Sequence, residues 1–202
     1  MSAGEFVYER LSGAQIATHI DDLARLRIDV FREFPYLYDG DEAYERNYLQ
    51  TYVDSPRSIV TLVYDDEELV GATTGLPMAD ETDEFRRAFD QAGYAVPTIF
   101  YCGESVLKNT HRGRGIYKHL FQAREENARA LGGFDIATFC CVQRPANHPL
   151  RPASYVPLND IWTRFGYTEH PELETEYSWK DIDESSATPK RMRFWMKDLH
   201  AK

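Results

Sequence analysis

A carboxylate and two arginines lie close together in the middle of this chain, and each could take part in a reaction. Glu104 is the only carboxylate in the otherwise apolar stretch 96–107. Burial disfavours the charged form of a carboxylate, so a buried Glu104 could accept a proton near neutral pH as a general base. The alternatives are a solvent-facing glutamate or one paired with an arginine. Arg112 and Arg114 are each followed by a glycine, and their permanent charge suits phosphate.

The elements around the two arginines would make this stretch an anion site. Residues 99–107 are rich in β-branched and aromatic side chains and predict a strand. A helix should follow, since apolar residues recur on one side of it until Gly132 and Gly133; they are Ile116, Leu120, Phe121, Ala128 and Leu131. The first N–H groups of a helix lack partners, and Gly113 and Gly115 have no Cβ to keep a ligand away. We therefore expect a pyrophosphate to bind at this turn, the alternative being a purely structural turn.

Two common phosphate-binding loops fit this turn poorly. A P-loop requires Lys followed by Ser or Thr after its last glycine, whereas Ile116 and Tyr117 follow here. A dinucleotide-binding fingerprint requires a third glycine, and position 118 is lysine. The run from Arg112 to Tyr117 instead resembles the acetyl-CoA loop of the GNAT (GCN5-related N-acetyltransferase) superfamily, which reads Arg/Gln-x-x-Gly-x-Gly/Ala. Its first four positions match, and Tyr117 stands where the family has a small residue.

The resemblance implies a set of contacts with acetyl-CoA as co-substrate. The pyrophosphate would bind the run Arg112, Gly113, Arg114, Gly115, Ile116 and Tyr117. In the family, the central strand diverges from its neighbour, and the pantetheine arm bonds to the exposed main chain. Ser105, Val106 and Leu107 would supply these bonds here, the alternative being ordinary pairing within a sheet.

Composition limits the class of protein. With 202 residues, of which 43% are apolar and 13% aromatic, the chain predicts a single folded domain spanning 1–202. No apolar run is long enough to span a bilayer and the first residues lack a secretion signal, so we expect a cytoplasmic protein. The net charge of −10 disfavours binding to nucleic acid or to an anionic membrane. Six scattered histidines without a close pair predict no metal site.

The remaining segments predict a sheet flanked by helices. Further helices are expected at 14–34, 42–53, 80–92 and about 157–165. Further strands are expected at 6–11, 58–64, 68–76, 134–142, 174–182 and 191–199. This order is also that of the GNAT fold, a single α/β (α+β) domain with a mixed, mostly antiparallel central sheet. The resemblance thus covers most of the chain, with a helical insertion near 80–93.

The resemblance also indicates where proton transfer would take place. The family's usual general acid is a tyrosine four residues before the glycine that ends the last helix, and this chain has Trp162 there. We expect Trp162 to be buried in the core with Leu158, Ile161 and Phe165. Tyr155, which stands where the family often has an asparagine, is the expected proton donor, the alternatives being packing or substrate contact. The candidate catalytic residues are therefore Glu104 and Tyr155.

The leading hypothesis is an acetyl-CoA-dependent N-acetyltransferase. It would transfer an acetyl group to a primary amine of a small molecule or peptide by direct attack in a ternary complex. The alternative is a noncatalytic acyl-CoA-binding module that senses the cofactor or mediates assembly, and the departures at Tyr117 and Trp162 favour it. A homodimer is compatible with both. An RNA-binding role for the Arg-Gly-Arg-Gly run is disfavoured by the acidic net charge of −10.

Overall fold

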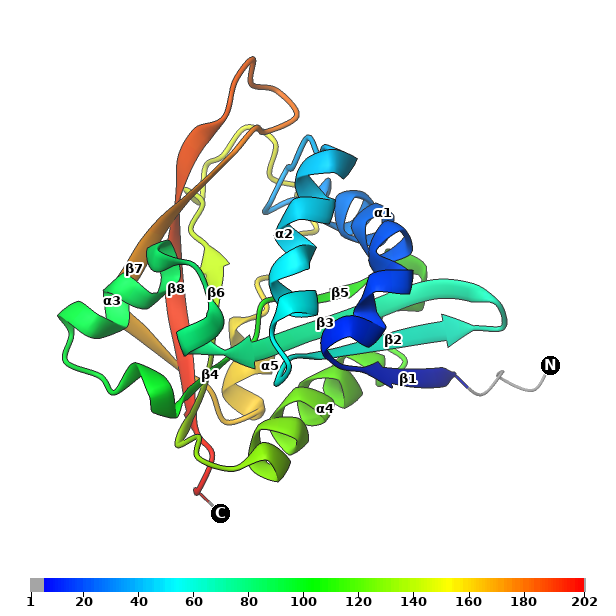
Figure 1. Ribbon diagram of the computed structural model, residues 1–202. Coiled ribbons are helices and arrows are strands. Elements are labelled where there is room, and N and C mark those ends of the chain that lie inside the picture. The colour runs from blue at the N-terminus through cyan, green and yellow to red at the C-terminus, as the bar shows by residue number, and fades with distance from the viewer. Residues whose placement is uncertain (1–5, 202) are drawn as a thin grey trace.

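The computed structural model describes residues 6–201, and one eight-stranded sheet forms its centre (Figure 1). The strands lie in the order β1-β2-β3-β4-β6-β8-β7, and β5 pairs with β3 off this path. Their bounds are β1 Val7–Leu11, β2 Ile59–Asp65, β3 Glu68–Pro77, β4 Ile99–Tyr101, β5 Ser105–Leu107, β6 Ile136–Val142, β7 Thr168–Trp179 and β8 Thr188–Asp198. All neighbours are antiparallel except β4 and β6, which are parallel. The expected mixed, mostly antiparallel sheet is confirmed.

Helices cover both faces of the sheet (Figure 1). α1 (Ile20–Phe31) and α2 (Glu42–Asp54) lie on one face, and α4 (Ile116–Leu131) lies on the other. α3 (Asp83–Gln91) packs against β7. The short α5 (Asn159–Arg164) contributes to the same apolar cluster as α4, whereas α1 and α2 belong to a second cluster across the sheet. The centre of the sheet is therefore buried on both faces, as the fully buried run of β3 shows.

The strand expected at 99–107 is two short strands that pair with different neighbours. β4 runs parallel to β6, and this pairing ends at the hydrogen bond from Cys102 N to Thr138 O, 2.7 Å. β5 pairs only with β3 among the strands of the described chain. At the break, Gly103 is required because a Cβ there would collide with the hydroxyl of Tyr52. The sheet therefore opens between β5 and β6, and its two halves diverge (Figure 1).

Several elements differ from their expected bounds where tertiary packing decides them. The first helical stretch begins as a 3-10 segment, Gly13–His19, and α1 ends at Phe31 instead of 34. α3 is shorter than the expected 80–92, and its buried residues are Phe85 and Phe89. Leu158, expected in the core, is 37% exposed because it precedes the first turn of α5. β7 begins at 168 instead of 174, with an irregular register in its first half.

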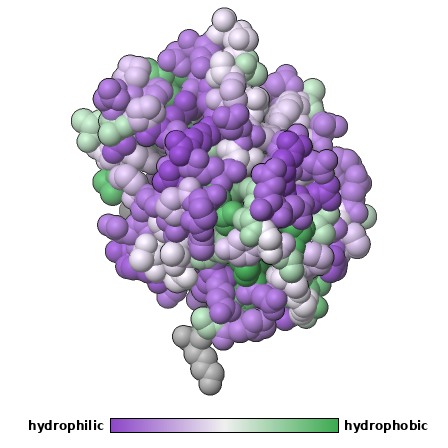
Figure 2. All heavy atoms as spheres, turned by 90° about the vertical axis from the view of Figure 1, so that its left-hand side faces the viewer, coloured by the Kyte–Doolittle hydropathy of each residue, from purple (hydrophilic) through white to green (hydrophobic). Residues whose placement is uncertain are grey.

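The surface is mostly polar. Figure 2 shows the face that bears α3 and β7, and hydrophilic residues cover most of it. The large apolar side chains that stay exposed in the described chain come from several separate elements; they are Val7, Tyr44, Leu131, Leu150, Val156, Leu158 and Ile182. Between residues 6 and 201, no helix is both long and apolar enough to cross a membrane.

Candidate active site

The glycine turn before α4 leaves main-chain amides accessible. After β5, a 3-10 turn (Asn109–His111) leads to Arg112, and α4 begins at Ile116. Gly113 and Gly115 have φ values of +78° and +84°, a region that other residues rarely adopt. A Cβ built on either glycine would meet no atom within 4 Å, so the space beside the first amides of α4 is open. The turn has the geometry of an anion site at a helix N-terminus.

The two arginines of this turn already contact carboxylates. Arg112 lies 2.9 Å from Glu33 and also donates to the main-chain oxygen of Leu107 at 3.2 Å. Arg114 Nη1 lies 3.5 Å from Asp65 Oδ2. Both guanidinium groups are partly exposed, so solvent and salt screen their charge. We therefore expect the open main-chain amides to contribute more to anion binding at this turn than the two arginines do.

β5 presents main-chain groups that do not pair with β3 to the opening in the sheet. Glu104 O accepts a hydrogen bond from β3 at 3.1 Å and Lys108 N donates one to β3 at 2.9 Å. Val106 lies between them in register and faces β3 as well. Because main-chain groups alternate along an antiparallel pair, Ser105 and Leu107 point their N–H and C=O groups away from β3, toward the opening. Of the three expected pantetheine contacts, these two lie at the open edge and Val106 does not.

A buried arginine of α4 lies beside this open edge. Arg124 is 1% exposed, and its guanidinium carbon lies 3.7 Å from the ring centre of Phe121. It donates to Ser105 Oγ at 2.9 Å, Ser105 Oγ contacts Thr73 Oγ1 at 2.8 Å, and Thr73 donates to Glu104 O at 2.7 Å. Its Nε and Nη2 atoms have no hydrogen-bond partner within the described chain. A buried charge without an anion is costly, so this guanidinium suits an anionic group that enters the opening.

A cavity of about 80 Å³ lies on the other face of the sheet, lined by α1, α2, α3 and four strands. Most of its lining side chains are aromatic: Phe31, Tyr36, Tyr38, Tyr44, Tyr48, Phe85, Tyr101, Tyr177 and Trp179. Its charged lining residues are Arg27, Glu45 and Glu104. Because Gly103 and Glu104 belong to the break between β4 and β5, the cavity reaches the opening in the sheet.

Glu104, the expected base, lines this cavity and is paired with an arginine. Arg27 Nη1 lies 2.5 Å from Glu104 Oε2, and Arg27 Nε lies 2.5 Å from Glu45 Oε2. All three side chains are buried, and the rings of Phe31 and Tyr48 lie over Arg27. An adjacent arginine favours the charged form of a carboxylate. Glu104 is therefore ion-paired with Arg27 at the inner end of the opening.

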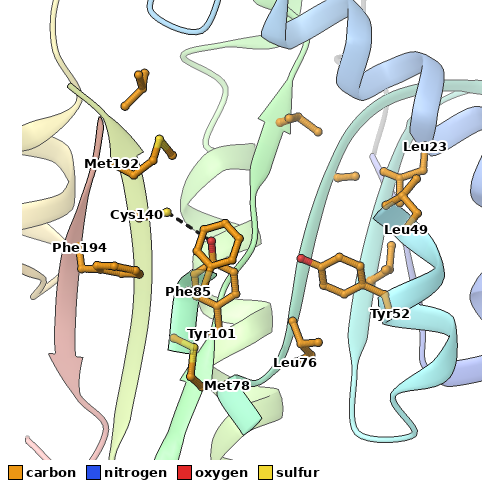
Figure 3. Close-up of a cluster of buried hydrophobic side chains, with 14 of the residues drawn as sticks. Leu23, Leu49, Tyr52, Leu76, Met78, Phe85, Tyr101, Cys140, Met192 and Phe194 are labelled. Atoms are coloured by element: carbon orange, nitrogen blue, oxygen red, sulfur yellow. Dashed lines mark hydrogen bonds between the residues drawn. The ribbon is translucent and has the colours of Figure 1, made fainter. Parts of the chain in front are cut away.

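The core beside the cavity contains no activated thiol among its described residues. Figure 3 shows the hydroxyl of Tyr101 pointing to Cys140, with which it makes a contact of 3.3 Å. Burial raises the pKa of the Cys140 thiol to about 12, so it stays protonated at neutral pH. Tyr52 of α2 points its hydroxyl at the sheet in the same view, next to Gly103. Tyr101 and Cys140 line the cavity and do not supply a nucleophile.

The two residues that depart from the resembled pattern contact each other. Trp162 is buried as expected, and its Nε1 donates to the hydroxyl of Tyr117 at 3.0 Å. Its aromatic partners are Phe139 and Trp195, and the exposed Leu158 is not part of this packing. Burial raises the pKa of Tyr117, so this hydroxyl is protonated at neutral pH. Because Tyr117 accepts from Trp162, its own proton is free to be donated.

Tyr155, the expected proton donor, is not among the residues that line the cavity. It lies in the loop that follows β6, where its ring is 4.7 Å from that of Phe34. Arg151 covers the same ring at 4.8 Å. The structure thus places Glu104 directly before β5, next to its open edge, and it places Tyr155 in a separate aromatic contact.

Sequence reasoning missed the buried charges of the site. Arg27 follows Leu23 by one helical turn, and Arg124 follows Leu120 by the same spacing, so both stand on apolar helix faces. A charged residue on an apolar helix face was the sign in the sequence that each arginine is buried. Glu81 is also buried, and burial raises its pKa to about 7. No spacing in the sequence distinguished Glu81 from the exposed carboxylates around it.

Known proteins share this fold, and a family model matches much of this sequence. Residues 21–153 match the model of the Acetyltransferase (GNAT) family. NAA60 of Arabidopsis thaliana in complex with acetyl-CoA is similar at 13% identity and a TM-score of 0.62, covering 98% of this chain and 100% of its own. The same protein in complex with a bisubstrate analogue is similar at 12% identity and a TM-score of 0.60, and the match covers 96% of this chain and 99% of that protein. An N-acetyltransferase from Staphylococcus aureus Mu50 is similar at 12% identity and a TM-score of 0.61, and the match covers 97% of this chain and 99% of that protein. A search of curated proteins found no match.

Proposed function

This chain belongs to the GNAT family of acetyltransferases, and on that premise we propose that it transfers the acetyl group of acetyl-CoA to a primary amine of a small molecule or peptide. The proposal rests on the observation that the glycine turn, the open edge of β5 and the aromatic cavity follow one another without a gap. The glycine turn leads back to the open edge of β5, and this edge begins at the aromatic cavity. The complexes of NAA60 with acetyl-CoA and with a bisubstrate analogue agree with such a use of this fold.

In this proposal, acetyl-CoA lies along the opening between β5 and β6. The amides of Gly113, Gly115 and Ile116 bind its pyrophosphate, since the space beside them is open and the helix N-terminus is partly positive. Ser105 bonds to the pantetheine arm through its main-chain groups and Leu107 through its N–H, since Arg112 already donates to Leu107 O. The thioester then lies next to Glu104 and the cavity, where the acceptor amine enters.

The proposed reaction is a direct attack in a ternary complex. The neutral amine attacks the carbonyl carbon of the thioester, the new C–N bond forms, and the C–S bond breaks. Glu104 takes the amine proton, directly or through a water molecule. Bringing the two reactants together in one site supplies much of the rate.

The thiolate that leaves needs a proton and a favourable charge. We prefer Tyr117 to Tyr155 as the donor, since the Tyr117 hydroxyl accepts from Trp162 Nε1 at 3.0 Å and keeps its own proton to donate. Arg124 would stabilise the thiolate until it is protonated, because two nitrogens of its buried guanidinium have no partner between residues 6 and 201. Solvent then returns the proton from Glu104 to Tyr117.

A noncatalytic acyl-CoA-binding module is the second candidate. The observation that favours it is Tyr117, whose large ring stands where the family has a small residue. Release of free thiol from acetyl-CoA in the presence of a panel of amines decides between the two. Amine-dependent release supports the transferase, and acetyl-CoA binding without release supports the binding module.

The cofactor site can be tested with two matched glycine variants. Gly115→Val should weaken acetyl-CoA binding roughly tenfold or more, because a side chain would occupy the approach to the amides and the φ of +84° would be strained. Gly93→Val is the control, since Gly93 has a φ of +80°, equally open surroundings and a position at the end of α3. Calorimetry should show wild-type affinity for Gly93→Val. Equal affinities of the two variants would reject this site.

A further inference from the structure

The charges around the cavity limit which amine it can accept. Arg27 is the only cation among its lining residues, and Glu45 and Glu104 are the only anions. Arg27 contacts both carboxylates at 2.5 Å, so its charge is shared between them. The three side chains together carry a net charge of −1 in a buried setting. A bound molecule with one positive charge would neutralise them.

The rest of the cavity wall suits an ammonium group on an apolar body. Aromatic faces attract cations and bury carbon chains. The hydroxyls of Tyr44 and Tyr177 contact each other, so α2 and β7 meet along this wall. No lining residue offers an unpaired cation to a carboxylate. An acidic group on the bound molecule would therefore stay without a partner.

The volume of the cavity limits the length of that body. A cavity of roughly 150 Å³ takes up benzene, which has six carbons, so the cavity here, roughly half as large, holds about three carbons. The amino-bearing carbon of a four-carbon amine would then lie in the opening beside Glu104. The cavity measures about 80 Å³. A bulky side chain would not fit beside the aromatic residues.

We infer that the acceptor is a small aliphatic primary amine that carries a single positive charge and no carboxylate. When it enters as an ammonium ion, the charge of the cavity and its contents falls to zero. An amino acid would bring an unpaired carboxylate, and a diamine would bring an unpaired second ammonium, and burying either is costly. This inference rests on the proposed function, because it takes the cavity to be the acceptor site.

Three probes with the same chain length test the inference on the unmodified protein. They are butylamine, 2-aminopentanoate, which is butylamine with an added carboxylate, and 1,4-diaminobutane. Calorimetry with CoA-saturated protein measures amine binding without acetyl transfer, and thiol release from acetyl-CoA measures transfer separately. We expect butylamine to bind roughly tenfold or more tightly than either of the other two.

The outcomes separate the inference from the proposed function. Equal or tighter binding of 2-aminopentanoate or of the diamine overturns the inference, and so does the absence of butylamine binding. Tight, selective butylamine binding without thiol release supports the inference and contradicts the transferase. Thiol release that is equally fast with all three probes supports the transferase and overturns the inference.

A charge variant gives a second test. Glu45→Gln makes the net charge of the lining zero, so butylamine should bind roughly tenfold more weakly and its advantage over 2-aminopentanoate should shrink. Glu42→Gln on the same helix is the control, because Glu42 is exposed and pairs with Arg46 at 2.6 Å, outside the cavity. Unchanged selectivity in a folded Glu45→Gln protein contradicts the inference. If this variant does not fold, the probe series on the unmodified protein decides.

Discussion

Glu104 is both the proposed base and one of the buried charged residues that line the cavity. It pairs with Arg27 and it lines the cavity, so its charge is available at the inner end of the opening in the sheet. Glu104→Gln keeps the shape and removes the base. We expect turnover to fall by roughly 10²- to 10⁴-fold, as is typical when a general base is lost.

The affinity for acetyl-CoA should change little in Glu104→Gln, because the main-chain groups of the glycine turn and of β5 make the proposed contacts. Steady-state kinetics with a true acceptor and calorimetry with CoA measure the two quantities separately. Wild-type turnover in this variant would mean that positioning alone drives the reaction and that the amine arrives already neutral.

Tyr117 is the residue to test for proton donation to the thiolate. Tyr117→Phe removes the hydroxyl that accepts from Trp162 at 3.0 Å and should lower turnover by roughly tenfold or more. The loss should shrink with an acetyl thioester whose thiol is more acidic, since that thiolate needs no proton to leave. Tyr155→Phe should have the smaller effect of the two. A larger loss in Tyr155→Phe would return the role of proton donor to Tyr155.

Glu81 should make stability depend on pH. Burial raises its pKa from 4.5 to about 7, so the folded state keeps a proton that the unfolded state has already lost. The stabilisation by this group is complete below pH 4.5 and is lost as the pH rises to about 7, a change of about 3 kcal/mol. Glu81→Gln removes the titration. Urea unfolding at pH 4.5 and pH 8 should show the variant gaining this amount relative to the wild type, and a constant difference would contradict the assignment.

At the scale of the elements, β5 is the strand whose partners decide the site. Its odd-numbered residues face the opening and its even-numbered ones face β3. Bound acetyl-CoA should therefore slow hydrogen exchange at the amides of Ser105 and Leu107 and change that of Val106 much less. Amide exchange measured by NMR with and without CoA checks this. Equal protection of all three amides would indicate that the whole strand is ordered by the ligand and that its open edge is not the binding surface.

At the scale of the molecule, a ligand in the opening would join the two diverging halves of the sheet. Such a ligand binds only the folded state, so acetyl-CoA at 100 times its dissociation constant should stabilise the protein by about 2.7 kcal/mol. Chemical denaturation with and without the ligand measures this. At the same ligand concentration, Gly115→Val should gain less than Gly93→Val. An equal gain in both variants would place the ligand elsewhere.

The sequence alone determined the features that depend on local chemistry. The hairpin of β2 and β3 follows from two β-rich runs around Asp65, Asp66 and Glu67, and the turn before α4 follows from Gly113 and Gly115, whose positive φ values few other residues tolerate. The order of elements and the glycine turn sufficed to indicate the family. These features could be predicted because neighbouring residues produce them.

Only the tertiary structure decided what depends on residues far apart in the chain. The strand expected at 99–107 is split because Tyr52 of α2 packs against Gly103 and because the pairing between β4 and β6 ends at Thr138. No pattern among neighbouring residues predicts a contact with a side chain from a distant helix. Likewise, Arg27 and Glu104 are 77 positions apart in the sequence, and only folding turns two ordinary charges into the buried pair that sets the charge of the cavity.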